Sequence, residues 1–108
     1  MQAGYVADKT LGYAQSTAVD ASTLISSLTF GSLAAAGIPA GTQILLIQPQ
    51  TQAIRWRDDG IAPTATVGYP LAVGAELRYT SQNLAALRVI SQTAGAIVNV
   101  VTYGTGAP

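Results

Sequence analysis

The chain has 108 residues, enough for one domain with a single core, and its five basic and five acidic side chains give it no net charge. A neutral chain offers no electrostatic attraction to nucleic acid or to an anionic membrane surface. It contains neither cysteine nor histidine, which excludes disulfides, thiolate nucleophiles and the commonest general base and metal ligand. The composition therefore predicts a structural or binding protein with no catalytic residues, no cofactor and no metal.

Charge is sparse as well as balanced. Only 9% of the residues are charged and 49% are hydrophobic, whereas about 25% are charged in ordinary soluble domains. Either uncharged polar side chains cover the surface or other subunits do, and the second interpretation is favoured. We expect a closed homo-oligomer, most simply a dimer or a trimer. No apolar run approaches the roughly 20 residues of a membrane-spanning helix.

The first twenty residues are small and polar, and two glycines interrupt any helical pattern. The segment 1–20 is predicted to be an extended arm that docks on a partner or on its own domain, which then covers residues 21–108. Its aromatic residues, Tyr5 and Tyr13, are candidate contacts with a partner.

The first half of the domain reads as three strands. The predicted strands are residues 23–30, residues 43–48 and residues 52–57, with a single helical turn at 32–36 between the first two. Pro49 is expected to end the second strand, because proline cannot donate to a ladder. Only three residues separate the second and third strands, which predicts an antiparallel hairpin.

The second half begins with a turn at 58–60 and a loop at 61–69. Residues 75–80 then alternate as a strand, with Leu77 and Tyr79 inward and Arg78 outward. Two last strands, residues 84–92 and 96–103, are expected to form a hairpin around the turn at 93–95, although a helix at 84–90 competes for the first of them. About seven short strands with Gly/Pro turns predict an all-β fold, a small single-domain β-sandwich or jelly-roll-like barrel.

The alternation in residues 52–57 places Ile54 and Trp56 on one face and Arg55 and Arg57 on the other. Trp56 is interpreted as a core anchor, with an interface contact or a sugar-stacking platform as the alternatives. Both arginines then point outward, where they can pair with carboxylates of a neighbouring strand or subunit. A carbohydrate or anion site on these arginines is the other interpretation.

Asp58 and Asp59 directly follow the arginines. Carboxylates at these positions can close a turn by local hydrogen bonds or bind Ca²⁺, and the turn is favoured because Asp-Asp-Gly lacks the spaced oxygens of a calcium loop. Arg55, Arg57, Asp58 and Asp59 join Tyr5 and Tyr13 as the candidate partner interface.

The stretch 54–71 reads Ile-Arg-Trp-Arg-Asp-Asp-Gly-Ile-Ala-Pro-Thr-Ala-Thr-Val-Gly-Tyr-Pro-Leu and is followed by Gly-Ala-Glu-Leu-Arg-Tyr, Leu-Arg-Val-Ile and Val-Asn-Val. Over residues 37–103 this pattern resembles small virion proteins encoded in the structural gene clusters of tailed bacteriophages. The resemblance implies a particle component such as a capsid cement or decoration protein. Such a protein binds the major capsid protein or other virion proteins on the particle exterior, after assembly in the host cytoplasm.

Two alternatives stay open beside the cement protein. One is a tail, baseplate or fibre-associated module that binds a host glycan, for which Tyr69 beside Pro70 is the best candidate contact. The other is a non-viral binding domain or an enzyme accessory domain.

Overall fold

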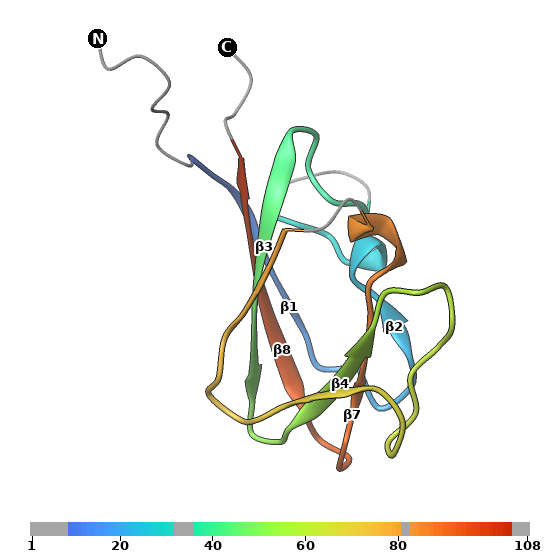
Figure 1. Ribbon diagram of the computed structural model, residues 1–108. Helices are drawn as coiled ribbons and strands as arrows, with labels where there is room; N and C mark the ends of the chain where they lie inside the picture. The colour runs from blue at the N-terminus through green and yellow to red at the C-terminus, as the bar shows by residue number, and fades with distance from the viewer. Residues whose placement is uncertain (1–8, 32–35, 81–82, 105–108) are drawn as a thin grey trace, which may run out of the picture.

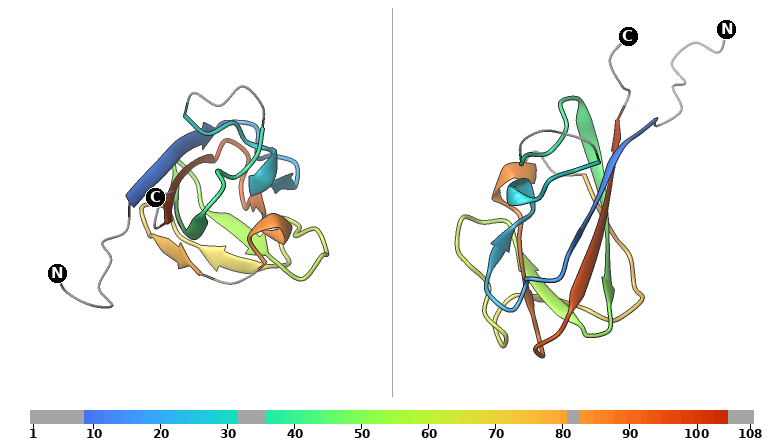
Figure 2. Two further views of the ribbon diagram at one scale, coloured as in Figure 1. Left: turned by 90° about the horizontal axis from the view of Figure 1, so that it is seen from above. Right: turned by 180° about the vertical axis from the view of Figure 1, so that it is seen from behind.

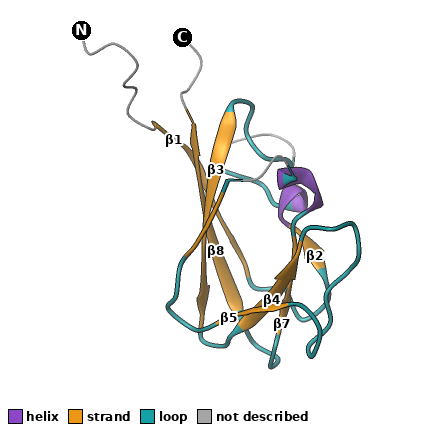
Figure 3. Ribbon diagram, viewed as in Figure 1, coloured by secondary structure: helices purple, strands orange, loops and turns teal. Residues whose placement is uncertain are grey.

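The computed structural model describes residues 9–31, 36–80 and 83–104. Two four-stranded antiparallel sheets face each other, which confirms the predicted all-β sandwich (Figures 1 and 3). Sheet A has the strand order β1-β8-β3-β6 and sheet B the order β2-β7-β4-β5. The elements are β1 (Lys9–Ser16), β2 (Thr23–Leu24), the 3₁₀ turn η1 (Ile25–Ser27), β3 (Thr42–Gln50), β4 (Ile54–Arg57), β5 (Tyr69–Leu71), β6 (Leu77–Tyr79), the 3₁₀ turn η2 (Leu84–Ala86), β7 (Arg88–Ser91) and β8 (Ile97–Gly104).

The core fills the space between the sheets, because alternate side chains of each strand point inward. Each branched or aromatic side chain that is fully buried contributes roughly 1.5–3 kcal/mol. Residues in the connections between strands also contribute to the core. The buried hydrophobic residues of the core are Ala14, Val19, Ile25, Phe30, Leu45, Ile47, Ile54, Tyr79, Leu87, Val89, Ala96, Val98 and Val100.

The strand β1 corrects the expected boundary between arm and domain. Residues 9–16 are extended, but they pair with β8 along their whole length and form one edge of sheet A. Ala14 and Ser16 are buried, and Val19 just beyond is fully buried. Residues 9–20 therefore belong to the domain, while residues 1–8, with Tyr5, lie outside the described residues. The small side chains that suggested an arm are needed here, since a Cβ on Gly12 would approach Phe30 Cβ to 3.1 Å.

Both predicted hairpins are wrong, because the two short loops connect the sheets rather than neighbouring strands. β3 and β8 lie in sheet A, whereas β4 and β7 lie in sheet B. The two loops meet at one end of the sandwich: the Thr51 hydroxyl donates to the Gly95 carbonyl at 2.6 Å, and the Gln92 N–H donates to the Ala53 carbonyl at 2.9 Å. Thr51 turns the chain with a φ of 72°. A short turn between two apolar strands fits a hairpin and a sandwich corner equally well.

Two predicted strands are shorter than expected. The strand expected at 23–30 is only β2, followed by η1, and the strand expected at 84–92 begins with η2, so the competing helical interpretation is correct for one turn. The two turns lie side by side (Figure 2), and the Ile25 N–H donates to the Leu87 carbonyl at 3.0 Å. The turn expected at 32–36 lies largely outside the described residues.

Pro49 does not end its strand. β3 continues to Gln50, with Pro49 opposite Val98 in β8. The Pro49 carbonyl accepts the Gly74 N–H at 2.9 Å on the side away from β8. The missing N–H of the proline lies on that same side, where β6 pairs only with residues 45–47, so no ladder hydrogen bond is lost.

Asp20 ties the loop between β1 and β2 to the corner between β7 and β8. Its Oδ1 accepts the Ser91 hydroxyl at 2.8 Å and the Gly95 N–H at 3.0 Å. These two hydrogen bonds, that from Gly95 first, lower the pKa of Asp20 below the ordinary value of 3.8. A carboxylate with a lowered folded-state pKa stabilises the fold above the unfolded-state pKa and loses that contribution as the pH falls through the folded one.

We therefore expect an acid-dependent difference between the parent and Asp20→Asn. The stability advantage of the parent should be complete at neutral pH and should shrink as the pH falls below 3.8. The measurement is the melting temperature of both proteins as a function of pH. Parallel curves at all pH values would show that Asp20 ionisation does not contribute.

Candidate functional site

The loop between β4 and β5 folds back over β4. Arg55 holds it there, because Nε donates to the Ala65 carbonyl at 3.0 Å and Nη1 to the Gly68 carbonyl at 2.9 Å. Gly68 packs tightly under the loop with a φ of 140°, and a Cβ there would lie 3.2 Å from the Trp56 carbonyl oxygen. Pro63, within the loop, is buried. Hydrogen bonds and close packing therefore give the loop a defined conformation.

Arg55 points away from the core, as predicted, but it binds its own loop. We expect Arg55→Ala to destabilise the fold by about 1 kcal/mol, since two carbonyls lose a donor that water replaces only in part. Residues 61–68 should also exchange their amide hydrogens faster. Arg55→Lys is the matched control, because it keeps the charge but cannot reach both carbonyls in one planar geometry. Unchanged exchange in both variants would contradict this role.

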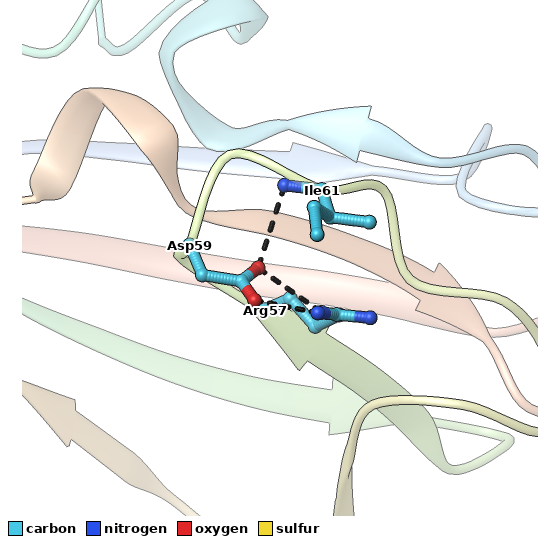
Figure 4. A network of polar contacts seen from close by, with 3 residues as sticks. All are labelled: Arg57, Asp59 and Ile61. Carbon is cyan, nitrogen blue, oxygen red and sulfur yellow. Dashed lines mark hydrogen bonds and ion pairs between the residues drawn. The ribbon is translucent and has the colours of Figure 1, made fainter.

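Arg57 and Asp59 form a bidentate ion pair at the start of the same loop (Figure 4). Nε lies 3.0 Å from Oδ1 and Nη2 lies 2.5 Å from Oδ2. Asp59 Oδ1 also accepts the Ile61 N–H at 3.4 Å. The hydrogen bonds from Arg57, assisted by that from Ile61, lower the pKa of Asp59, and the same pairing raises the pKa of Arg57. Both side chains are thus charged and held in one orientation.

Asp58 points elsewhere, although it is the neighbour of Asp59. Its carboxylate accepts the Tyr79 hydroxyl, which links the β4–β5 loop in sheet B to β6 in sheet A. The two carboxylates therefore have different partners. Among the residues that the structure describes, no three acidic, cysteine or histidine side chains gather closely enough to hold a metal ion.

Three aromatic rings lie beside this polar group, at the open edge between the sheets. Trp56 packs against the core from the inner face of β4, as predicted. Its ring lies 4.9 Å from that of Tyr69 with a 30° tilt, and 6.0 Å from that of Tyr79 in an edge-on contact. Tyr79 is 5% exposed, whereas Tyr69 is 64% exposed. A pocket of about 430 Å³ opens here, lined by Arg57, Asp58, Asp59, Val67, Gly68 and Tyr69.

A second candidate site is the outer face of sheet A. In β3 and β8 the outward side chains are apolar at several positions, although the inward ones already form the core. Tyr13, Val101 and Leu46 are direct neighbours in one row across three strands. No other strand or helix of the described part lies over this face (Figure 1). The outer face of sheet A comprises Tyr13, Gln15, Ile44, Leu46, Gln48, Gln50, Arg78, Ile97, Asn99, Val101 and Tyr103, and Arg78, in the edge strand β6, is the charged residue among them.

Amide side chains form a polar row within this apolar face. Asn99 Oδ1 accepts the Tyr13 hydroxyl at 2.7 Å and Gln15 Nε2 at 2.9 Å, and Asn99 Nδ2 donates to Gln50 Oε1 at 3.0 Å. These hydrogen bonds fix the polar groups along the centre of the sheet. The face thus presents apolar area together with a defined pattern of amide donors and acceptors.

The structure separates the predicted interface residues into two places. Tyr13 lies on the outer face of sheet A, 48% exposed, whereas Arg57, Asp58 and Asp59 line the pocket on the β4–β5 loop. The outward residues Leu46 and Val101 are not among the predicted interface residues, although apolar residues on both faces of a strand indicate that both faces are covered.

Comparison with known proteins gives no relative: no family model, curated protein or solved structure matches the chain. In the described ranges, no helix has the length and apolar character needed to cross a membrane.

Proposed function

We propose that the protein is a non-enzymatic virion structural protein of a tailed bacteriophage, a capsid cement or decoration protein that binds the major capsid lattice through the outer face of sheet A. The observation that carries the proposal is the outer face of sheet A, which is partly apolar across β1, β8 and β3 and has a charged residue, Arg78, in the edge strand β6. The resemblance of residues 37–103 to small virion proteins supplies the identity of the partner.

The physical reason is that the two faces of an antiparallel sheet usually differ in polarity. Such a sheet usually has one apolar face on the core and one polar face in solvent. In β3 and β8 both faces carry large apolar side chains, among them Leu46 and Val101. Covering the second face would add roughly 25 cal/mol for each Å² of apolar area removed from water. A capsid subunit that covers this face would bind the protein with the free energy that this burial supplies.

The row of amides supports a specific partner over random association. Amide groups that a partner covers must find hydrogen bonds, because an unpaired buried donor or acceptor costs about 1–3 kcal/mol. Asn99, Gln15 and Gln50 would therefore select a surface with matching polar groups. Copies on the particle exterior can also contact one another, in keeping with the proposed homo-oligomer.

The test is the addition of purified protein to phage particles that lack it. The protein should sediment with the particles, label their heads in negative-stain images, and raise the temperature at which they release DNA. Failure to sediment with the particles would refute the proposal. Labelling confined to the tail, baseplate or fibres would instead favour the alternative virion module.

A further inference from the structure

Tyr69 is an exposed aromatic residue whose ring packs on that of Trp56. It lies directly opposite Trp56 in the β4–β5 ladder, and the two rings lie 4.9 Å apart with a small tilt. Trp56 is in turn fixed against the core and against Tyr79. The Tyr69 ring is thus supported from inside while 64% of the residue remains exposed. A tyrosine side chain packed in this way loses little conformational freedom when a ligand stacks on its ring.

Polar groups of fixed orientation lie in the same pocket. The Arg57 guanidinium and the Asp59 carboxylate lie side by side, and the carboxylate also accepts a hydrogen bond from the Ile61 N–H (Figure 4). Asp59 remains half exposed despite these contacts. A carboxylate has about four lone-pair directions and a guanidinium has five N–H donors, so both groups keep hydrogen-bonding capacity after pairing. The pocket offers donors and acceptors next to an aromatic face.

We propose that this pocket binds a neutral saccharide, with Tyr69 stacking on the C–H face of a pyranose ring and the Arg57–Asp59 pair contacting its hydroxyl groups. A pyranose has an apolar face and a rim of hydroxyl groups that both donate and accept. The pocket matches both features, and its volume of about 430 Å³ lies within the range of small-ligand sites. The inference is independent of the proposed contact with a capsid, which uses the other sheet.

Other ligand classes fit the pocket less well. The one cation and two carboxylates among its lining residues give a net negative charge, which disfavours phosphate and other anions. A metal cation would compete with Arg57 for Asp59 and with the Tyr79 hydroxyl for Asp58. An added peptide strand would meet β5, which is three residues long and contains Pro70, a residue without an N–H to donate.

The experiment titrates the full chain with the methyl glycosides of glucose, galactose, mannose and N-acetylglucosamine. Trp56 is the only tryptophan of the chain, so its fluorescence reports directly on the ring that supports Tyr69. At least one neutral glycoside should change this fluorescence with a Kd on the order of millimolar. Inorganic phosphate and glucuronate, the anionic probes, should not.

Variants of exposed tyrosines locate the site. Tyr69→Ala should weaken binding roughly fivefold to tenfold, because the stacking surface is lost, while Tyr69→Phe should retain it. Tyr13→Ala is the matched control, since it removes an exposed tyrosine from the outer face of sheet A. Asp59→Asn should weaken binding with the melting curve little changed.

Three results would overturn the proposal. They are no response to any of the four glycosides, equal affinity in Tyr69→Ala and the parent, or a response to phosphate that exceeds the response to the sugars. Particle sedimentation of Tyr69→Ala separates this proposal from the capsid function. Normal sedimentation with lost sugar binding supports both, whereas lost sedimentation would make Tyr69 a protein contact and would contradict the saccharide site.

Discussion

Deleting residues 1–20 is expected to abolish cooperative folding, not merely to weaken the binding of a partner. The deletion removes β1, which pairs with β8 from Lys9 opposite Gly104 to Ser16 opposite Val98. It also removes the fully buried Val19 and the hydrogen bonds of Asp20 to the β7–β8 corner. Each lost ladder hydrogen bond is worth about 0.5–1.5 kcal/mol, and a domain has only about 5–15 kcal/mol in total.

The measurement is the thermal unfolding of the truncated chain, followed by circular dichroism and by the dispersion of its amide resonances. Deletion of residues 1–8 alone is the matched control, because it leaves every described contact of β1 in place. A chain that lacks residues 1–20 and still melts like the parent would show that β1 is dispensable.

Replacing Val101 by lysine is expected to eliminate particle binding while the domain stays folded. Val101 lies in the centre of the outer face of sheet A, between Tyr13 and Leu46. An ammonium group buried there without a partner costs several kcal/mol, which corresponds to at least a hundredfold loss of affinity. The free protein keeps the lysine in water, so its melting temperature should change little.

Two variants control for charge and for shape. Thr93→Lys adds the same charge on an exposed residue of the β7–β8 turn, and Val101→Thr keeps the branched shape without a charge. Both should sediment with particles far better than Val101→Lys. Equal binding by all three variants and the parent would show that this face is not the docking surface.

The sequence predicts local structure better than it predicts connections. Leu77, Arg78 and Tyr79 in β6 alternate as predicted. In a strand with one face on the core and the other in solvent, the alternation of apolar and polar residues indicates which side chains point inward. The two loops that cross between the sheets have the length and composition of hairpin turns. Their direction depends on contacts such as that between Thr51 and Gly95, which are 44 residues apart in sequence.

In the candidate sites, too, local pairs could be predicted, whereas contacts between distant residues could not. Arg57 and Asp59 are two residues apart, so their pairing could be anticipated from the Arg-Asp-Asp-Gly turn. The support of Tyr69 by Trp56 depends on the register between β4 and β5, which no local pattern specifies. The role of the outer face of sheet A could not be predicted for another reason. Apolar runs such as that around Leu46 predict a covered strand without saying which molecule covers its second face.

Hydroxyl-radical footprinting of the free and the particle-bound protein tests the central claim most directly, because it reports the solvent access of individual side chains. Binding through the outer face of sheet A predicts that Tyr13, Leu46 and Tyr103 become protected on particles, while Ile61 and Tyr69 stay as reactive as in the free protein. Protection of Ile61 and Tyr69 with unchanged labelling of Tyr13, Leu46 and Tyr103 would contradict it.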